Sequence, residues 1–306
     1  MSAHHHSRDH GRHSHALADF GAAFAIGVIL NTAFVAVGLV FGILGHSMAL
    51  IADAGHNLGD VLGLAMAWGA NQLVKRAPSQ RFTYGLRSSS ILAALFNAVF
   101  LLVATGAIAL GAIQRFFHPE PVAGNIVMIV AAIGIVVNTV SALFFLRGRH
   151  GDLNVRGAFL HLAGDAAISF GVVLAGLVIV LTGWHWVDAA VSLGISAIII
   201  MGTWSLMRDS LSMTLHGVPS GVDASEVRAF LMSRPGVCAI HDLHIWPMST
   251  TETALTCHLV IPAGHPGDQV LHEIAEELEH RFSIPHTTIQ VEISEDPNCA
   301  LHEHAA

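Results

Sequence analysis

Six long apolar segments separated by short polar connectors fill the first 208 of the 306 residues. About 20 consecutive apolar residues are enough to cross the hydrocarbon core of a bilayer. The segments therefore predict a membrane protein whose all-α domain has six transmembrane helices, at residues 20–44, 48–74, 88–113, 124–146, 157–181 and 186–207.

The pattern changes after Arg208 to short elements with alternating polarity. A helix is expected at 219–237, with Ser220 near its start and Pro235-Gly236 at its end. Two strands at 238–249 and 251–262, an amphipathic helix at 265–282 and a strand at 286–294 follow. The order α-β-β-α-β predicts a small two-layer α+β domain. The expected domains are a His-rich tail at 1–19, a membrane domain at 20–208, a soluble domain at 209–298 and a Cys/His tail at 299–306.

Composition supports this division. Hydrophobic residues make up 53% of the chain and charged residues only 12%, about half the share of a soluble globular protein. Residues 1–208 hold 11 Lys/Arg and 8 Asp/Glu, whereas residues 209–306 hold 3 and 14. An acidic soluble domain argues against nucleic acid as a partner.

The distribution of Lys and Arg predicts the orientation of the chain. The connectors after the second and fourth segments carry four and three basic residues, and the opposite side has only Arg115. By the positive-inside rule, both termini are expected in the cytoplasm, and the first apolar segment is too long for a signal peptide. A bacterial inner membrane is the expected location.

Histidine is abundant, with 22 residues in the chain. Six of them lie within the first fifteen positions: His4, His5, His6, His10, His13 and His15. An expression tag is one interpretation, but Ser, Arg, Asp and Gly interrupt the run, which favours a natural metal-collecting tail. The three cysteines do not form a disulfide framework.

Four carboxylates lie inside the apolar segments, which contain no Lys or Arg to pair with them: Asp53, Asp60, Asp165 and Asp188. Intramembrane acids usually line a cavity, share a proton or bind a cation. Asp60 and Asp165 are each the last residue of an H-x-x-x-D motif, which begins at His56 and at His161. Residues i and i+4 share a helix face, so two facing helices would offer two imidazole nitrogens and two carboxylate oxygens, a set that suits tetrahedral zinc. The alternative is a separate His–Asp pair within each helix.

Asp53 and Asp188 have open roles. Asp53 lies three residues before His56 and could orient its ring, relay a proton or metal, or cap the second helix. Asp188, next to Trp186, is expected to cap the sixth helix. The two motifs lie at different depths on the expected boundaries, so either the fifth helix begins before Gly157 or a cytoplasmic cavity reaches the site.

The chain resembles the zinc-exporting branch of the cation diffusion facilitator family. The resemblance is carried by "HSMALIADAGHNLGDVLGL", "RFTYGLRSSSILAALFNA", "NVRGAFLHLAGDAAISFGV", "VPSGVD", "HDLHIW" and "HTTIQVE" followed by Cys299. It implies a homodimer with six membrane helices per protomer, a cytoplasmic domain of ferredoxin-like fold, and exchange of divalent metal for protons by alternating access. The family's paired motifs map onto His56/Asp60 and His161/Asp165.

The resemblance also implies a regulatory metal site at the dimer interface. His241, His258 and His272 match its histidine positions, Asp296 matches its acidic ligand, and Ser294 stands where relatives have a last histidine. Cys299 and His302 could complete such a site. His244 lies three residues after His241, so on a regular strand the two face opposite sides unless a bulge intervenes. Surface histidines without metal are the alternative.

These features favour proton-coupled efflux of Zn²⁺, with Co²⁺, Cd²⁺ or Ni²⁺ as further substrates and H⁺ as counter-substrate. Two other interpretations remain open. An intramembrane metallohydrolase would need a motif such as H-E-x-x-H, which the sequence lacks. A membrane metal sensor or buffer would not need ligands buried in two helices.

Overall fold

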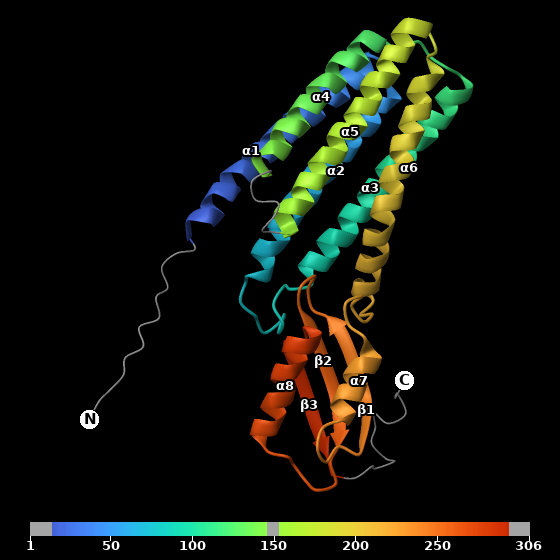
Figure 1. The fold of residues 1–306 in the computed structure, drawn as a ribbon. Helices are drawn as coiled ribbons and strands as arrows, with labels where there is room; N and C mark the ends of the chain where they lie inside the picture. Colours follow the sequence, from blue (N-terminus) through green and yellow to red (C-terminus); the bar gives the residue numbers. More distant parts are fainter. Residues whose placement is uncertain (1–13, 146–152, 294–306) are drawn as a thin grey trace. The chain divides into compact units, whose positions relative to one another are not determined.

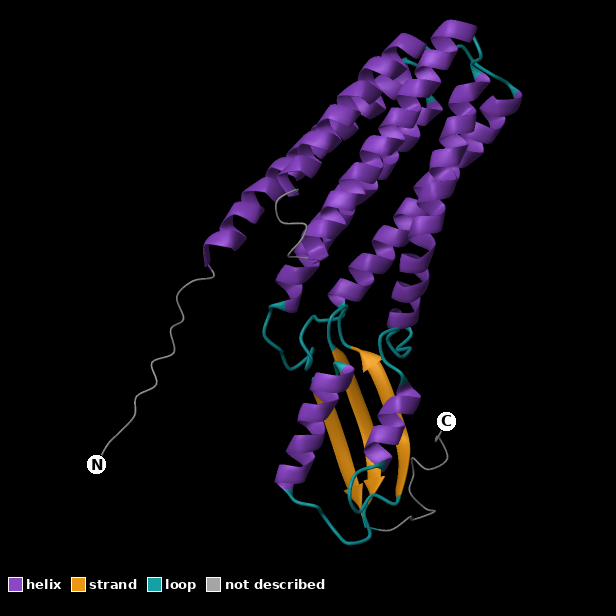
Figure 2. Ribbon diagram, in the orientation of Figure 1, coloured by secondary structure: helices purple, strands orange, loops and turns teal. Residues whose placement is uncertain are grey.

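A computed structural model describes residues 14–145 and 153–293, with side chains described for 28–143 and 159–293. Six long helices come first, followed by a small mixed domain (Figures 1 and 2). The long helices are α1 (Ser14–Leu44), α2 (Met48–Val74), α3 (Ser89–Phe117), α4 (Gly124–Phe145), α5 (Leu153–Thr182) and α6 (Trp186–Thr214). Every predicted long helix is present, most with boundaries within a few residues of expectation.

Four of the described helices, α3 to α6, are long and apolar enough to cross a membrane. In α1, whose side chains are described from residue 28 onward, the described apolar stretch is Val28–Leu44. Helix α2, which carries Asp53, His56 and Asp60, is not among these four. The chain is therefore an integral membrane protein with four clear spans. Helix α5 begins at Leu153, before the expected start at Gly157, which removes part of the difference in depth between the two motifs.

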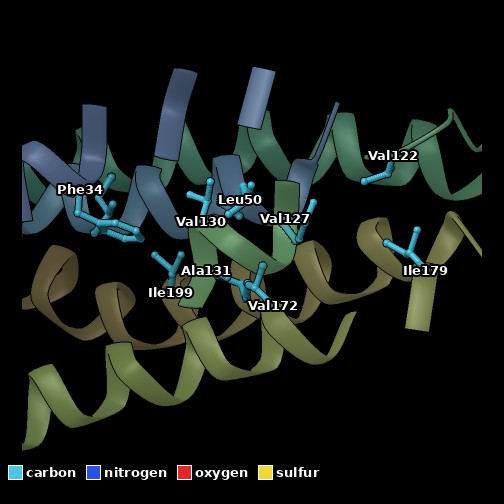
Figure 3. Close-up of a cluster of buried hydrophobic side chains, with 13 residues drawn as sticks. Phe34, Leu50, Val122, Val127, Val130, Ala131, Val172, Ile179 and Ile199 are labelled. Carbon is cyan, nitrogen blue, oxygen red and sulfur yellow. The ribbon is translucent and has the colours of Figure 1, made fainter. Parts of the chain in front are cut away.

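Contacts divide the chain into two compact units. The first joins residues up to Leu62 with Leu101–Met201, and the second joins Gly63–Phe100 with Gly202 onward. In the first unit α4 lies beside α5 and α1 packs on α4. Its core contains aliphatic and aromatic side chains from the long helices, including Phe34, Leu50, Val127 and Val172 (Figure 3). Burial of such side chains supplies the main stabilising contacts of the packed helices.

Asp188 caps a helix, although not its own. Its carboxylate accepts hydrogen bonds from the backbone N–H of Met48 at 2.6 Å and from the Ser47 hydroxyl at 2.5 Å, at the start of α2. The side chain is 1% exposed, so the first turn of α2 has a buried anion at its positive end. The sequence placed Asp188 correctly as a cap and assigned it to the wrong helix, because residues 141 positions apart meet only in the folded bundle.

The second unit contains a three-stranded mixed sheet in the order β1-β2-β3. Strand β1 (Ala239–Pro247) pairs antiparallel with β2 (Thr253–Val260), and β2 pairs parallel with β3 (His286–Glu292). Helices α7 (Ala224–Met232) and α8 (Asp268–Phe282) contact each other and the sheet, enclosing a core that includes Leu231, Leu255 and Leu278. The predicted order α-β-β-α-β is confirmed.

Helix α7 begins one turn later than the sequence indicated. Asp223, not Ser220, is its N-cap, and the carboxylate accepts hydrogen bonds from the backbone N–H groups of Ser225 and Glu226. The Ser225 hydroxyl donates to the same oxygen. These hydrogen bonds hold the pKa of Asp223 below its ordinary value. An aspartate stabilises the N-terminus of α7 more than a serine would, because its negative charge also interacts favourably with the helix dipole.

Candidate metal centre

Helices α2 and α5 bring both H-x-x-x-D motifs to one place within the first unit. The closest pairs run between the helices: His56 Nε2 lies 3.2 Å from Asp165 Oδ1, and His161 Nε2 lies 3.3 Å from Asp60 Oδ2. Within each helix the His–Asp distances are longer, 3.7 Å in α2 and 3.6 Å in α5. The alternative of two separate pairs, one in each helix, does not describe this arrangement. We call these four residues the tetrad.

The four His–Asp distances of the tetrad are similar to the edge lengths of a small coordination tetrahedron. Zinc bound at about 2.0–2.1 Å to nitrogen and oxygen ligands requires ligand atoms roughly 3.3–3.4 Å apart. The four His–Asp distances, from 3.2 to 3.7 Å, lie around that value. Ligand atoms of His56, Asp60 and Asp165 also lie within 4.8 Å of one another. His161 is not part of this group of three, although its ring approaches Asp60 and Asp165.

Access to the tetrad is uneven. The Asp165 side chain is 3% exposed, whereas His161 is 49% exposed. The His161 ring stands edge-on to the His56 ring, with centroids 5.9 Å apart. A cation could therefore reach the site past His161 and lose its water against the buried carboxylate of Asp165.

Asp53 lies beside the tetrad and is fully buried. One carboxylate oxygen accepts a hydrogen bond from the Ser169 hydroxyl on α5 at 3.2 Å. The start of α2 is capped by Asp188, so Asp53 is not the cap of its helix. Ser169 was not predicted from the sequence, although its position four residues after Asp165 places it on the tetrad face of α5.

Two glycines of α2 permit close helix packing on its α3 side. A Cβ at Gly59 would lie 2.5 Å from Leu101 Cδ1, and one at Gly55 would lie 3.0 Å from Ile108 Cδ1. The glycines of α5 near the motif are different, because a Cβ at Gly164 or Gly171 would meet nothing within 4 Å. Close approach therefore explains Gly55 and Gly59 of α2 but not Gly164 and Gly171 of α5.

A second group of possible ligands lies on the sheet. His241 on β1 is paired in register with His258 on β2, and Glu292 at the end of β3 accepts from both rings, at 2.9 and 2.8 Å. Ligand atoms of these three residues lie within 4.8 Å of one another. Burial would raise the pKa of Glu292, but its hydrogen bonds to the two histidines and their charge outweigh burial and hold the pKa below its ordinary value.

A bulge in β1 shapes this group. The register shifts between His241 and His244, where Asp242 adopts a positive φ of 51°. The Asp242 carboxylate lies 3.7 Å from His258 and 2.8 Å from the exposed ring of His244. The bulge that the sequence left open is present, and His244 is not part of the group of three.

Glu292 was not predicted as a ligand from the sequence. The one feature of the sequence that could have indicated Glu292 is its acidic side chain at the end of β3, which pairs with the strand that carries His258.

Of the remaining predicted ligands of the regulatory site, the structure describes His272, which is not part of this group. His272 on α8 is exposed and pairs with Glu276 on its own helix at 3.3 Å. Asp296, Cys299 and His302 lie outside the described residues, as do His4, His5, His6, His10 and His13. His15 falls in α1, where its side chain is not described. Their roles stay predictions.

Cys257 is not available as a metal ligand. Its side chain is buried in the core of the sheet domain, and burial raises the pKa of the thiol to about 12. A thiolate is the form that binds metal. Cys238 is a free, exposed thiol.

Comparison with known proteins gives two family matches that together span most of the chain. The family model described as the cation efflux transmembrane domain matches residues 24–215. The model described as the cytoplasmic domain of cation efflux proteins matches residues 219–294.

Curated relatives match nearly the full length. The metal cation efflux system protein CzcD of Cupriavidus metallidurans is 36% identical over 284 residues, covering 92% of this chain and 90% of the relative. The zinc transporter ZitB of Escherichia coli shows the same identity and coverage. The cadmium, cobalt and zinc/H(+)-K(+) antiporter of Bacillus velezensis is 33% identical over 297 residues, covering 95% and 93%. A solved structure of the metal-bound C-terminal domain of the CzcD transporter is 42% identical, with a TM-score of 0.22, and covers 23% of this chain and 99% of its own.

Proposed function

Because the chain belongs to the cation efflux family, also called the cation diffusion facilitator family, whose members are metal transporters and not enzymes, we propose that it exports Zn²⁺ in exchange for protons through the tetrad. Co²⁺ and Cd²⁺ are further candidate substrates, since both appear with zinc in the name of one relative. Ni²⁺ is proposed only because its chemistry suits similar donors. Because the chain belongs to a family of transporters, it is not interpreted as an intramembrane metallohydrolase.

The observation that carries the proposal is the meeting of His56, Asp60, His161 and Asp165 across two helices. Two imidazoles and two carboxylates suit zinc, which accepts both donor types in tetrahedral sites. The two carboxylates also balance the charge of a divalent ion in a region of the chain without Lys or Arg. A sensor or buffer has no comparable need for ligands on two membrane helices.

The same residues explain exchange for protons. Zinc binds neutral imidazole and ionised carboxylate, so loading expels protons from the site. His56 and His161 belong to the residue type that changes protonation between about pH 5 and 8. A site open to a more acidic compartment regains protons as metal leaves, and a site open to the cytoplasm gives them up as metal binds. The proton gradient therefore drives metal outward by alternating access.

The wider architecture is proposed as follows. The protomer has six membrane spans, both termini in the cytoplasm of a bacterial inner membrane, and domain boundaries at residues 20, 209 and 299. The sheet domain has a ferredoxin-like fold and forms a homodimer, as the family resemblance implies. The His-rich N-terminal tail gathers metal on the cytoplasmic side.

We also propose that His241, His258 and Glu292 bind a regulatory zinc ion. Their convergence on one face of the sheet supports this site, with Asp242 as a fourth donor beside it. His272 and the terminal residues Asp296, Cys299 and His302 are candidates to join the site across a dimer.

The test of transport uses purified protein in proteoliposomes that contain a zinc-sensitive dye. A pH step should drive zinc across the membrane, reversal of the step should reverse the direction of the drive, and a protonophore that collapses the step should abolish it. The Asp60→Ala variant should lose the flux, and a panel of Co²⁺, Cd²⁺, Ni²⁺ and Mn²⁺ gives the selectivity. Native-rate zinc flux by Asp60→Ala would show that the tetrad is not the transport site.

A further inference from the structure

Asp53 and Ser169 form a polar pair beside the tetrad that the proposed transport cycle does not use. Asp53 precedes His56 by three residues on α2, and Ser169 follows Asp165 by four on α5. The tetrad contacts show that the two helices run in opposite directions, because His56 meets Asp165 and Asp60 meets His161. Both members of the pair are therefore displaced to the same side, about one helical turn toward the start of α2.

The surroundings fix this pair in place. Asp53 and Ser169 are both 0% exposed. On α4 a Cβ at Gly134 would lie 3.0 Å from the Ser169 hydroxyl, so the glycine leaves room for it. The Asn57 amide donates to the backbone oxygen of Asp53 at 2.8 Å and holds that turn of α2.

Among the side chains that the structure describes, no Lys or Arg pairs with Asp53. The charged or titratable groups that act on it are His56 on its own helix and Asp165 on α5. The described part of α1 and all of α4 contain no titratable residue. On α3 and α6, Arg115 and Asp188 lie at the ends nearest the start of α2 and are engaged there, with the His46 backbone and with Met48. A carboxylate without exposure to water and without a paired cation is costly, so such a group usually holds a cation of its own.

The number of ligand groups around Asp53 indicates which cation it binds. Within the described residues, the second carboxylate oxygen of Asp53 accepts no hydrogen bond, and the first has Ser169 alone. One carboxylate and one hydroxyl fall short of the four ligands that zinc takes. A proton requires only one oxygen, and the other oxygen keeps its bond to Ser169.

We propose that Asp53 is a proton-binding residue that couples zinc movement to proton movement. The inference rests on the proposed function and adds a residue to it. A dication in the tetrad and a proton on Asp53 repel each other across about one helical turn of a poorly solvated interior, so they occupy the protein alternately. Filling the tetrad releases the proton of Asp53, and emptying it allows the proton to return. Ser169 positions the carboxylate.

The test compares two modes of transport by the same proteoliposomes. Zinc uptake driven by a pH step requires protons to move, whereas exchange of radioactive zinc for unlabelled zinc at equal pH on both sides requires none. In Asp53→Asn, the isosteric neutral amide should lower the pH-driven flux, because fewer protons move with each zinc ion, and leave zinc exchange within about twofold of wild type. A pH-indicator titration should show about one proton fewer released per zinc bound.

Controls separate this role from a merely structural one. Asp188→Asn removes another buried carboxylate, distant from the tetrad, and should leave the ratio of pH-driven flux to exchange unchanged. Ser169→Ala should shift the pH dependence of flux, and Ser192→Ala, another fully buried serine, should not. If Asp53→Asn keeps the wild-type ratio and proton count, the inference is wrong. If it loses both modes equally while remaining folded, Asp53 serves zinc binding and the inference is also wrong. If the wild-type protein shows exchange but no pH-driven flux, the proposed antiport itself fails.

Discussion

Replacing Asp165 by Asn tests whether the tetrad holds the metal. The substitution keeps the shape of a side chain that is 3% exposed and lies 3.2 Å from His56, and it removes one negative charge. With zinc bound, the wild-type site is neutral, because two carboxylates offset the dication. The variant site would carry one uncompensated positive charge at a position with almost no contact with solvent.

The magnitude follows from the cost of that charge. Removing one partner of a buried charge pair costs about 3–5 kcal/mol, and each 1.4 kcal/mol is roughly a factor of ten in affinity. The dissociation constant for zinc should therefore rise by about two to four orders of magnitude. The His56 and His161 rings remain, so binding is weakened and not abolished.

The assay is a competition titration with a zinc-chelating dye on detergent-purified protein. The background carries His241→Ala and His258→Ala, which remove the histidines of the sheet-domain group so that only the tetrad is measured. Asp188→Asn is the matched control. It should lower thermal stability, because Met48 and Ser47 lose their buried anionic acceptor, while zinc affinity stays within about threefold. If Asp165→Asn binds zinc within about threefold of the background protein, the charge reasoning is refuted.

Three further predictions follow from particular contacts. His161→Asp should raise the ratio of Mn²⁺ to Zn²⁺ flux, because the site would then contain one imidazole and three carboxylates, and oxygen ligands suit harder ions. An unchanged ratio in the metal panel would contradict this. Gly59→Ala should destabilise the protein by about 1–3 kcal/mol, since its Cβ would lie 2.5 Å from Leu101; Gly164→Ala, with open space around its Cβ, should cause no loss in the same thermal unfolding experiment. Glu292 has a pKa below its ordinary value of 4.5, so its carboxylate should stabilise the metal-free protein above that pH and lose this effect as the pH falls further. The difference in melting temperature between wild type and Glu292→Gln in EDTA should therefore shrink on acidification, and a constant difference would argue against the pairing with His241 and His258.

The local sequence determined much of this protein because its strongest signals are short-range. Apolar length and helical spacing placed α2 and α5 and put His56 with Asp60, and His161 with Asp165, on one face each. Turn residues and alternation gave the order of the small domain. These patterns depend on 20 residues or fewer, and hydrophobicity and backbone geometry decide them locally.

Contacts between distant segments required the tertiary structure. From the sequence, the two motifs could be assigned to one site only because the same motif occurs twice. Helix packing decided that the shortest His–Asp distances join α2 to α5. Glu292 joined His241 and His258 because strand register places β3 beside β2. Asp188 caps α2, and Ser169 holds Asp53, because helix packing brings together groups more than 100 positions apart. Buried polar groups are satisfied by whatever neighbour the fold supplies, and no local pattern specifies that neighbour.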